Sequence, residues 1–348
     1  MITLYEYKNK NYKNNFVYKI IMISYMFILI IILSYIYKLK SKLLYIFDKE
    51  KENLNYCKIK KKDYYNNFFV IITNSNMSNC GLFCYYNIYL GCLESFINQG
   101  YIPIVDLYSF PNVFNGFKAN STKNNPWEYY FHQPLCYTLK DVIKKAKNYK
   151  YSKCRVLGPK FTDFYNKTIS ISYWHDFAKK YIPIKNEIIK ESKKIMKRLF
   201  HNSNNILGVL IRGTDYLSLK PIGHPITPNY SIVIKDIKEM DKKNNYDFFF
   251  LTTEDNFIRK KFILLLGNKV KYFQNTEIKY NYKQKIYLSF NNKVAGNLDN
   301  MKNYLINIII LSKCIDIITS RTNGSVAAFL FNNGLYRNNK VYFLGLYE

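Results

Sequence analysis

Apolar runs alternate with polar turns from residue 66 onward. Phe68–Thr73 is an apolar run of strand length, and the apolar positions between Leu82 and Ile97 keep helical spacing, with Gly100 placed as a C-cap. Ile102–Leu107 is a second apolar run of strand length. Two strands joined by a helix predict a βαβ unit, and therefore a parallel sheet with a right-handed crossover.

The alternation of apolar runs and polar turns continues to the C-terminus. Thr138 with Asp141 has the pattern of a capping box, and Ile184–Leu199 has the pattern of a helix with lysines on its outer face. The polar stretch 201–205 then separates two α/β regions. The later elements that we expect are a strand over Ile206–Ile211, a helix starting at Thr227-Pro228, a strand over Asp247–Leu251, a helix over Met301–Lys313, a strand over Ile315–Thr319, a helix beginning near Ser325 and a strand over Val341–Leu344.

The N-terminal part has a different pattern. Residues 20–37 carry no charge, and as a helix they would span roughly 27 Å, enough for one membrane crossing. No small-residue cleavage site follows, so we expect an uncleaved anchor preceded by a tail over residues 1–19 and followed by a charged linker over 38–65. Lysines lie on both sides of the span, so its orientation stays open between a secretory-pathway type II protein and a bacterial inner-membrane protein.

Composition narrows the function classes. The formal net charge is +28, but the basic residues are spread along the chain instead of forming a patch, which disfavours a nucleic-acid partner. The seven cysteines include no pair or cluster with zinc-site spacing, so no metal is expected. They are compatible with one or two disulfides, whose pairing the sequence does not decide, or with small buried apolar residues.

Three polar turns follow strands of the C-terminal region, at residues 212–216, 252–255 and 320–325. Ligands of open parallel sheets bind outside the carboxyl ends of the strands, so these turns should converge. Arg212 can chelate phosphate oxygens, and the amides around Asn323–Val326 open a helix whose dipole favours an anion. Together they predict a diphosphate site. The sequence has neither a Walker-type run nor a GxGxxG run, so this site differs from those of P-loop and ordinary dinucleotide-binding proteins.

The same turns resemble the motifs of a known family. Arg212-Gly213-Thr214-Asp215-Tyr216 is similar to the first motif of the fucosyltransferase superfamily that includes α1,2-, α1,6- and protein O-fucosyltransferases. Leu251–Asp255 is similar to its strand-end motif, and Thr319–Ser325 to its serine-rich third motif. Asn79–Leu82 is similar to its early Gly/Asn-rich loop, and the order and spacing agree over residues 66–348.

This resemblance implies a GT-B-like α/β architecture with two Rossmann-like parallel-sheet domains, an N-terminal acceptor-side domain over 66–205 and a nucleotide-sugar-binding domain over 206–348. It implies an inverting, metal-independent transfer from GDP-fucose to a glycan or protein hydroxyl. No cofactor is expected beside this substrate. The donor contacts that it implies are Arg212, Thr252, Glu254, Asp255, Arg321, Thr322, Gly324 and Ser325.

Several roles stay open. A base could be Asp215 or His224, although Asp215 could only hold Arg212 or cap its loop and His224 could only be packed. Acidic residues at a strand end, here Glu254 and Asp255, are also common helix caps, and Arg321 could be a surface residue. Two further segments are candidates for a donor or acceptor loop: Asn79 with Gly81, and Trp127 with Glu128.

Aromatic side chains stack on sugars, but the aromatics of the long loop between residues 108 and 134 could equally pack that loop onto the body. Two other functions also remain. One is a glycosyltransferase with another nucleotide sugar, and the other is a catalytically silent, membrane-tethered module that binds a glycan or a protein.

Overall fold

A computed structural model describes residues 62–348, except 78–79, 155, 166–169, 214–215, 218–219, 221 and 274–293. The predicted tail and membrane anchor, and most of the predicted linker, lie outside the described residues. None of the helices in the described part is both long and apolar enough to cross a membrane. Residues 60–348 cluster as one compact unit.

The first sheet has three parallel strands, β1 (Phe68–Thr73), β2 (Ile102–Asp106) and β3 (Asn148–Ser152), in the order β2-β1-β3. Helix α2 (Leu82–Asn98) connects β1 to β2 and confirms the predicted βαβ unit. After α2, Gly100 has a φ of +82°, which a residue without a Cβ adopts at little cost. Strand β3 was missed because its middle residues, Tyr149, Lys150 and Tyr151, are exposed and the strand has no apolar run.

The connection from β2 to the second sheet contains short elements and three longer helices. The long loop contains three 3₁₀ turns, and Thr138 caps the helix after it by accepting from the backbone N–H of Asp141, as the capping box predicts. The elements of this connection are the turns η2 (Val113–Asn115), η3 (Pro126–Tyr129) and η4 (Pro134–Cys136), and the helices α3 (Leu139–Lys145), α4 (Phe161–Tyr165), α5 (Ile171–Tyr181) and α6 (Asn186–Phe200). The turn η1 (Ser75–Met77) lies earlier, between β1 and α2.

The second sheet has five parallel strands in the order β6-β5-β4-β7-β8, so β4 lies at its centre between β5 and β7. Each strand is close to its predicted position, except the short β6, which the sequence analysis missed. Their bounds are β4 Ile206–Leu210, β5 Phe248–Thr252, β6 Val270–Lys271, β7 Asp316–Ser320 and β8 Asn339–Tyr342.

Four helices and one 3₁₀ turn accompany this sheet: α8 (Tyr230–Asn244), α9 (Asn256–Leu266), η5 (Gly267–Lys269), α11 (Val294–Leu311) and α12 (Asn323–Asn332). The predicted start of α8 at Thr227-Pro228 was wrong by two residues. Asn229 is the N-cap, because its side chain accepts from the N–H of Ser231, a role for which Asn is preferred over Thr.

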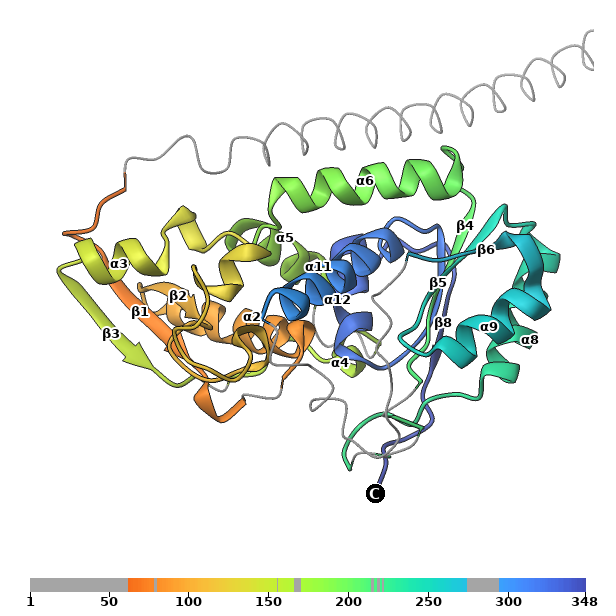
Figure 1. The fold of residues 1–348 in the computed structure, drawn as a ribbon, viewed down its shortest axis with the longest axis horizontal. Helices are drawn as coiled ribbons and strands as arrows, with labels where there is room; N and C mark the ends of the chain where they lie inside the picture. The colour runs from red at the N-terminus through yellow and green to blue at the C-terminus, as the bar shows by residue number, and fades with distance from the viewer. Residues whose placement is uncertain are drawn as a thin grey trace, which may run out of the picture. The chain divides into compact units, whose positions relative to one another are not determined.

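The two sheets share a hydrophobic core. Helix α11 packs against α6, and α12 packs against α2 and α5, so the C-terminal helices contact elements of the first region (Figure 1). One cluster of buried side chains includes residues from both, such as Val70, Tyr86, Leu305 and Ala327. The division between residues 205 and 206 therefore separates two sheets that share one large buried cluster, although each sheet also has a smaller cluster of its own. As a domain boundary it stays a prediction.

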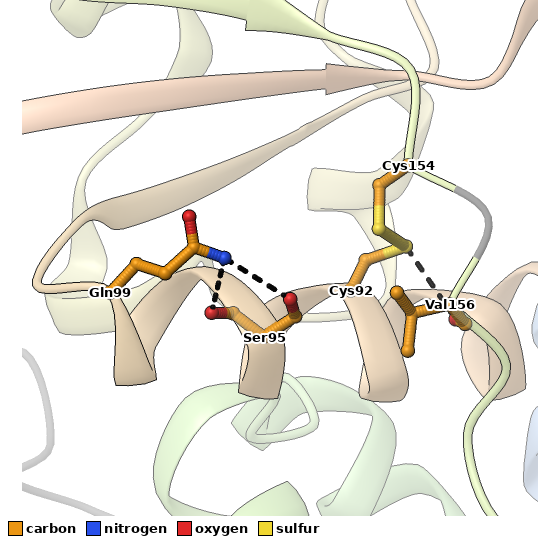
Figure 2. Close-up of a disulfide and its surroundings, with 5 residues drawn as sticks. All are labelled: Cys92, Ser95, Gln99, Cys154 and Val156. Carbon is orange, nitrogen blue, oxygen red and sulfur yellow. Dashed lines mark hydrogen bonds between the residues drawn. A yellow bond between two sulfur atoms is a disulfide. The ribbon is translucent and has the colours of Figure 1, made fainter.

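A disulfide links α2 to the segment after β3. Cys92 and Cys154 are 62 residues apart in the chain, and Cys92 Sγ also lies 3.6 Å from the carbonyl oxygen of Val156 (Figure 2). Closing a loop of this length stabilises the fold by about 4 kcal/mol in the chain-entropy model. Tertiary structure thus supplies a pairing that the cysteine spacing left open.

Candidate functional site

The carboxyl ends of β4, β5 and β7 bring the predicted polar turns together, as their order in the sheet requires. Arg212 follows β4, and its Nε lies 3.2 Å from Oε1 of Glu254, which follows β5. The backbone N–H of Gly213 donates to the same oxygen at 2.9 Å. Glu254 therefore fixes both the Arg212 side chain and the backbone beside it. In this structure the Glu254 carboxylate therefore contacts Arg212 directly.

Two tyrosines also lie beside Arg212. The guanidinium carbon lies 4.8 Å from the ring centroid of Tyr216, a cation–π contact. Tyr304, on α11, lies beside Arg212, and the two side chains interact electrostatically. Burial raises the pKa of Tyr304 to about 12, so its hydroxyl remains protonated at physiological pH. Sequence reasoning missed Tyr304 because it lies in an apolar helix far from the motifs, and nothing in its local pattern distinguishes it from core.

Tyr304 also connects Arg212 to the start of α12. A Cβ added to Gly324 would lie 2.2 Å from the Tyr304 hydroxyl oxygen, so this hydroxyl rests against the backbone of the first turn of α12. The first amides of a helix have no carbonyl partner within it, which makes the N–H groups of Asn323 and Gly324 suitable for an anion. The Arg212 guanidinium, the Tyr304 hydroxyl and this helix start are therefore neighbours.

The serine-rich turn has a different role from the expected one. Thr322 is the N-cap of α12, not Ser325, and its hydroxyl oxygen accepts from the backbone N–H of Ser325. The Ser325 hydroxyl is fully buried and lies 2.7 Å from the hydroxyl of Thr319. This side chain therefore builds the turn, and what the turn can offer a ligand is backbone N–H groups.

Three other predicted donor contacts, Thr252, Asp255 and Arg321, lie in different surroundings. Thr252 is buried, with 3% of its surface exposed. Asp255 is the N-cap of α9 and accepts from the N–H groups of Phe257 and Ile258, the helix-cap alternative for this residue. Arg321 turns toward the C-terminal segment, where its guanidinium carbon lies 5.2 Å from the ring centroid of Phe343.

Of the two candidate bases, only His224 is described. It is exposed, and its Nδ1 lies 3.0 Å from the Tyr216 hydroxyl, so Tyr216 connects it to Arg212. Asp215 lies outside the described residues, as does Asn79. Gly81 is described and is the N-cap of α2, with open space where a Cβ would be.

The long aromatic loop packs onto the body. Trp127 is fully buried, with its ring 5.3 Å from Tyr89 and 4.5 Å from Phe131, so the expectation that it stacks on an acceptor sugar does not fit. Glu128 accepts from the N–H of Leu139 at 2.8 Å. Burial raises the pKa of Glu128, against the opposing effect of its hydrogen bonds. Both side chains anchor the loop, which is the alternative stated above.

Within the described ranges, no group of three or more His, Cys, Asp or Glu side chains is arranged to hold a metal ion.

The solved structures to which this chain is similar include fucosyltransferases. No protein-family model matches the chain, and no curated protein matches it. Among solved structures, it is similar to NodZ α-1,6-fucosyltransferase soaked with GDP-fucose, with 13% identity, a TM-score of 0.42 and coverage of 76% of this chain and 93% of that one. It is also similar to POFUT1 in complex with GDP-fucose, with 10% identity, a TM-score of 0.47 and coverage of 82% and 99%. A third similar structure is fucosyltransferase NodZ from Bradyrhizobium, with 12% identity, a TM-score of 0.41 and coverage of 76% and 92%.

Proposed function

We propose that this protein is a membrane-anchored glycosyltransferase that transfers fucose from GDP-fucose to a glycan or protein hydroxyl, with inversion and without a metal ion. The observation that carries the proposal is the position of Arg212, which Glu254 and Tyr304 hold beside the start of α12. A fixed guanidinium next to unpaired helix amides suits the diphosphate of a nucleotide sugar. GDP and fucose as donor groups rest on the motif resemblance, and the anchor rests on the uncharged residues 20–37.

In the proposed reaction, the acceptor oxygen attacks the anomeric carbon on the face opposite the diphosphate. The new carbon–oxygen bond forms as the bond to the diphosphate breaks, and the electron pair of the broken bond leaves with the diphosphate. Arg212 and the amides of Asn323 and Gly324 stabilise this growing negative charge, which is where preorganised donors lower a barrier most. The acceptor proton passes to a base.

His224 is the described candidate for that base. Its Nδ1 lies 3.0 Å from the Tyr216 hydroxyl, and a histidine is the side chain that most often acts as a general base. The Tyr216 ring lies over the Arg212 guanidinium, so the base and the cation belong to one connected group. Asp215, within the first motif, is the other candidate, and the mechanism does not depend on the choice.

Calorimetric titration of the full-length chain tests the donor site. The titrants are GDP and UDP in a buffer that contains a chelator and no divalent metal. We expect GDP to bind and UDP to bind more weakly. Arg212→Ala should reduce GDP affinity by about 100-fold, the scale for removing one member of a hydrogen-bonded charge pair.

Arg198→Ala is the matched control, because Arg198 is an exposed arginine on α6 outside the site. It should leave GDP affinity unchanged. Failure of the folded protein to bind either nucleotide would overturn the proposed function in favour of a silent binding module. Tighter binding of UDP than of GDP would replace the donor by another nucleotide sugar, and binding only after addition of a divalent cation would overturn metal independence.

A further inference from the structure

Two cysteines at the start of α2, one on each side of Gly81, form a close thiol pair that the proposed mechanism does not use. The Sγ atoms of Cys80 and Cys84 lie 2.9 Å apart, and both residues are partly buried. They are separate from the disulfide that Cys92 forms further along the same helix. The only other free cysteine in the described part of the chain, Cys314, is buried.

The backbone holds this pair in position. Gly81 is the N-cap of α2, and its carbonyl oxygen accepts from the N–H of Cys84 at 3.1 Å. The N–H of Cys80 donates to the carbonyl oxygen of Met77 at 3.0 Å, and the hydroxyl of Tyr85 donates to the same oxygen at 2.5 Å. Cys80 is therefore held by a hydrogen-bonded turn and Cys84 by the first turn of α2. This places their sulfur atoms close together. Bringing them from 2.9 Å to the roughly 2.05 Å of a disulfide requires less than about 1 Å of movement.

The two thiols differ in reactivity. Hydrogen bonding with the Cys80 thiol lowers the pKa of Cys84, whereas the same bond and burial raise the pKa of Cys80. Cys84 also lies in the first turn of α2, where the helix N-terminus favours a thiolate. The thiolate is the reactive form of cysteine, so we expect Cys84 to attack and Cys80 to resolve.

We propose that Cys80 and Cys84 are a redox-modification site. A small-molecule disulfide oxidises the two thiols to a disulfide bond across the N-terminal end of α2. The Cys84 thiolate attacks one sulfur of the small-molecule disulfide, forms a mixed disulfide and releases the first thiol. Cys80 then attacks Cys84 Sγ and releases the second. Two protein thiols are oxidised, the small-molecule disulfide is reduced to two thiols, and the protons of the protein thiols end on the released thiols.

The test is incubation of the full-length chain with glutathione buffers that range from fully reduced to fully oxidised. After acid quenching and alkylation, mass spectrometry of the peptides reports the state of each cysteine. We expect Cys80 and Cys84 to lose two hydrogens together as the buffer becomes oxidising, while Cys314 remains a free thiol. Reversal by added reduced glutathione should restore both thiols.

Single variants separate the two roles. In Cys80→Ser, Cys84 should accumulate a stable glutathione adduct, because the resolving thiol is absent. In Cys84→Ser, Cys80 should remain mostly a free thiol. Cys314→Ser is the control and should leave oxidation of the pair unchanged, and circular dichroism of each variant verifies that it folds. Free thiols at both positions of the wild-type chain in fully oxidised buffer, or a glutathione adduct in place of the internal bond, would overturn the proposal.

Discussion

Two arginine–carboxylate pairs lie at opposite ends of the strands of the second sheet. We call the side where the strands begin the amino edge and the side where they end the carboxyl edge. At the amino edge, Arg337 binds Asp316 through Nε at 3.2 Å and a terminal nitrogen at 2.5 Å, and the backbone N–H of Asn338 donates to Asp316 at 2.7 Å. The Tyr246 hydroxyl donates to it as well. At the carboxyl edge, Arg212 meets Glu254 through Nε at 3.2 Å.

The two pairs differ in which charged group has the larger number of contacts, the carboxylate or the guanidinium. Around Asp316, which is fully buried, the donors converge on the carboxylate, and the side chain of Arg337 is 44% exposed. Around Arg212 the groups converge on the cation: a carboxylate, a tyrosine hydroxyl and a tyrosine ring, with 22% of the arginine side chain exposed. A saturated carboxylate stabilises a fold, whereas a positioned, accessible cation is suited to a ligand. We therefore assign the first pair to folding, whereas the second has the features that the proposed donor site requires.

Asp316→Ala should have the largest effect on stability. The variant removes a buried carboxylate that satisfies donors from three residues, so we expect unfolding free energy to fall by about 3 kcal/mol. Denaturant unfolding monitored by circular dichroism measures this loss. The folded fraction should still bind GDP with unchanged affinity, and a loss of affinity in that fraction would contradict the division of roles between the two pairs.

Acid should weaken the amino-edge pair. Burial alone raises the pKa of Asp316, but hydrogen bonds from Arg337, Tyr246 and Asn338 outweigh it and lower the pKa below its usual value of 3.8. Because the folded-state pKa is the lower one, the stabilisation is complete above the unfolded-state pKa and is lost as pH falls through the folded-state pKa.

The pH dependence of unfolding below pH 4 should therefore be smaller in Asp316→Asn than in the wild-type chain. Chemical denaturation at a series of pH values measures it. Equal slopes in the two proteins would show that other carboxylates dominate acid unfolding.

Gly324→Ala should disturb the carboxyl-edge site. Its Cβ would meet the Tyr304 hydroxyl at 2.2 Å, and moving that buried ring should cost about 1–3 kcal/mol of stability and lower GDP affinity about tenfold. Thermal unfolding and calorimetric titration measure the two effects.

Tyr304→Phe separates the steric effect from the polar one. Alone, it removes the hydroxyl that lies beside Arg212 and should lower GDP affinity about fivefold, or about 1 kcal/mol. Combined with Gly324→Ala, it should restore most of the stability without restoring affinity. Recovery of both would mean that the hydroxyl does not position Arg212.

Tyr216→Phe should have the smallest effect. It removes the hydroxyl that binds His224 but keeps the ring over Arg212, so GDP affinity should stay within about twofold and stability within about 0.5 kcal/mol. Hydrolysis of GDP-fucose by water should slow severalfold, with an altered pH profile. An unchanged profile would remove His224 from the mechanism and favour Asp215.

Local pattern predicted most elements of both sheets. The βαβ unit at Phe68–Asp106 and strands β4, β5 and β7 are apolar runs with clear turns between them, so propensity and burial agree. Element ends were less well predicted, as at Asn229 and Thr322, because several neighbouring residues can cap a helix and only the final geometry selects one. The exposed edge strand β3 has no apolar pattern to detect.

The sequence by itself determined the alternation of strands and helices and the uncharged run at 20–37, because each depends on residues close together in the chain. The convergence of the three polar turns was predicted by a general rule for ligands of parallel sheets, and the strand order of the folded sheet brings it about. Only the tertiary structure decided that Tyr304 lies against Gly324, that Glu254 binds Arg212, that Trp127 is buried and that Cys92 pairs with Cys154. These contacts join residues far apart in the chain, and their partners are selected by how the sheets and helices pack, which no local periodicity encodes.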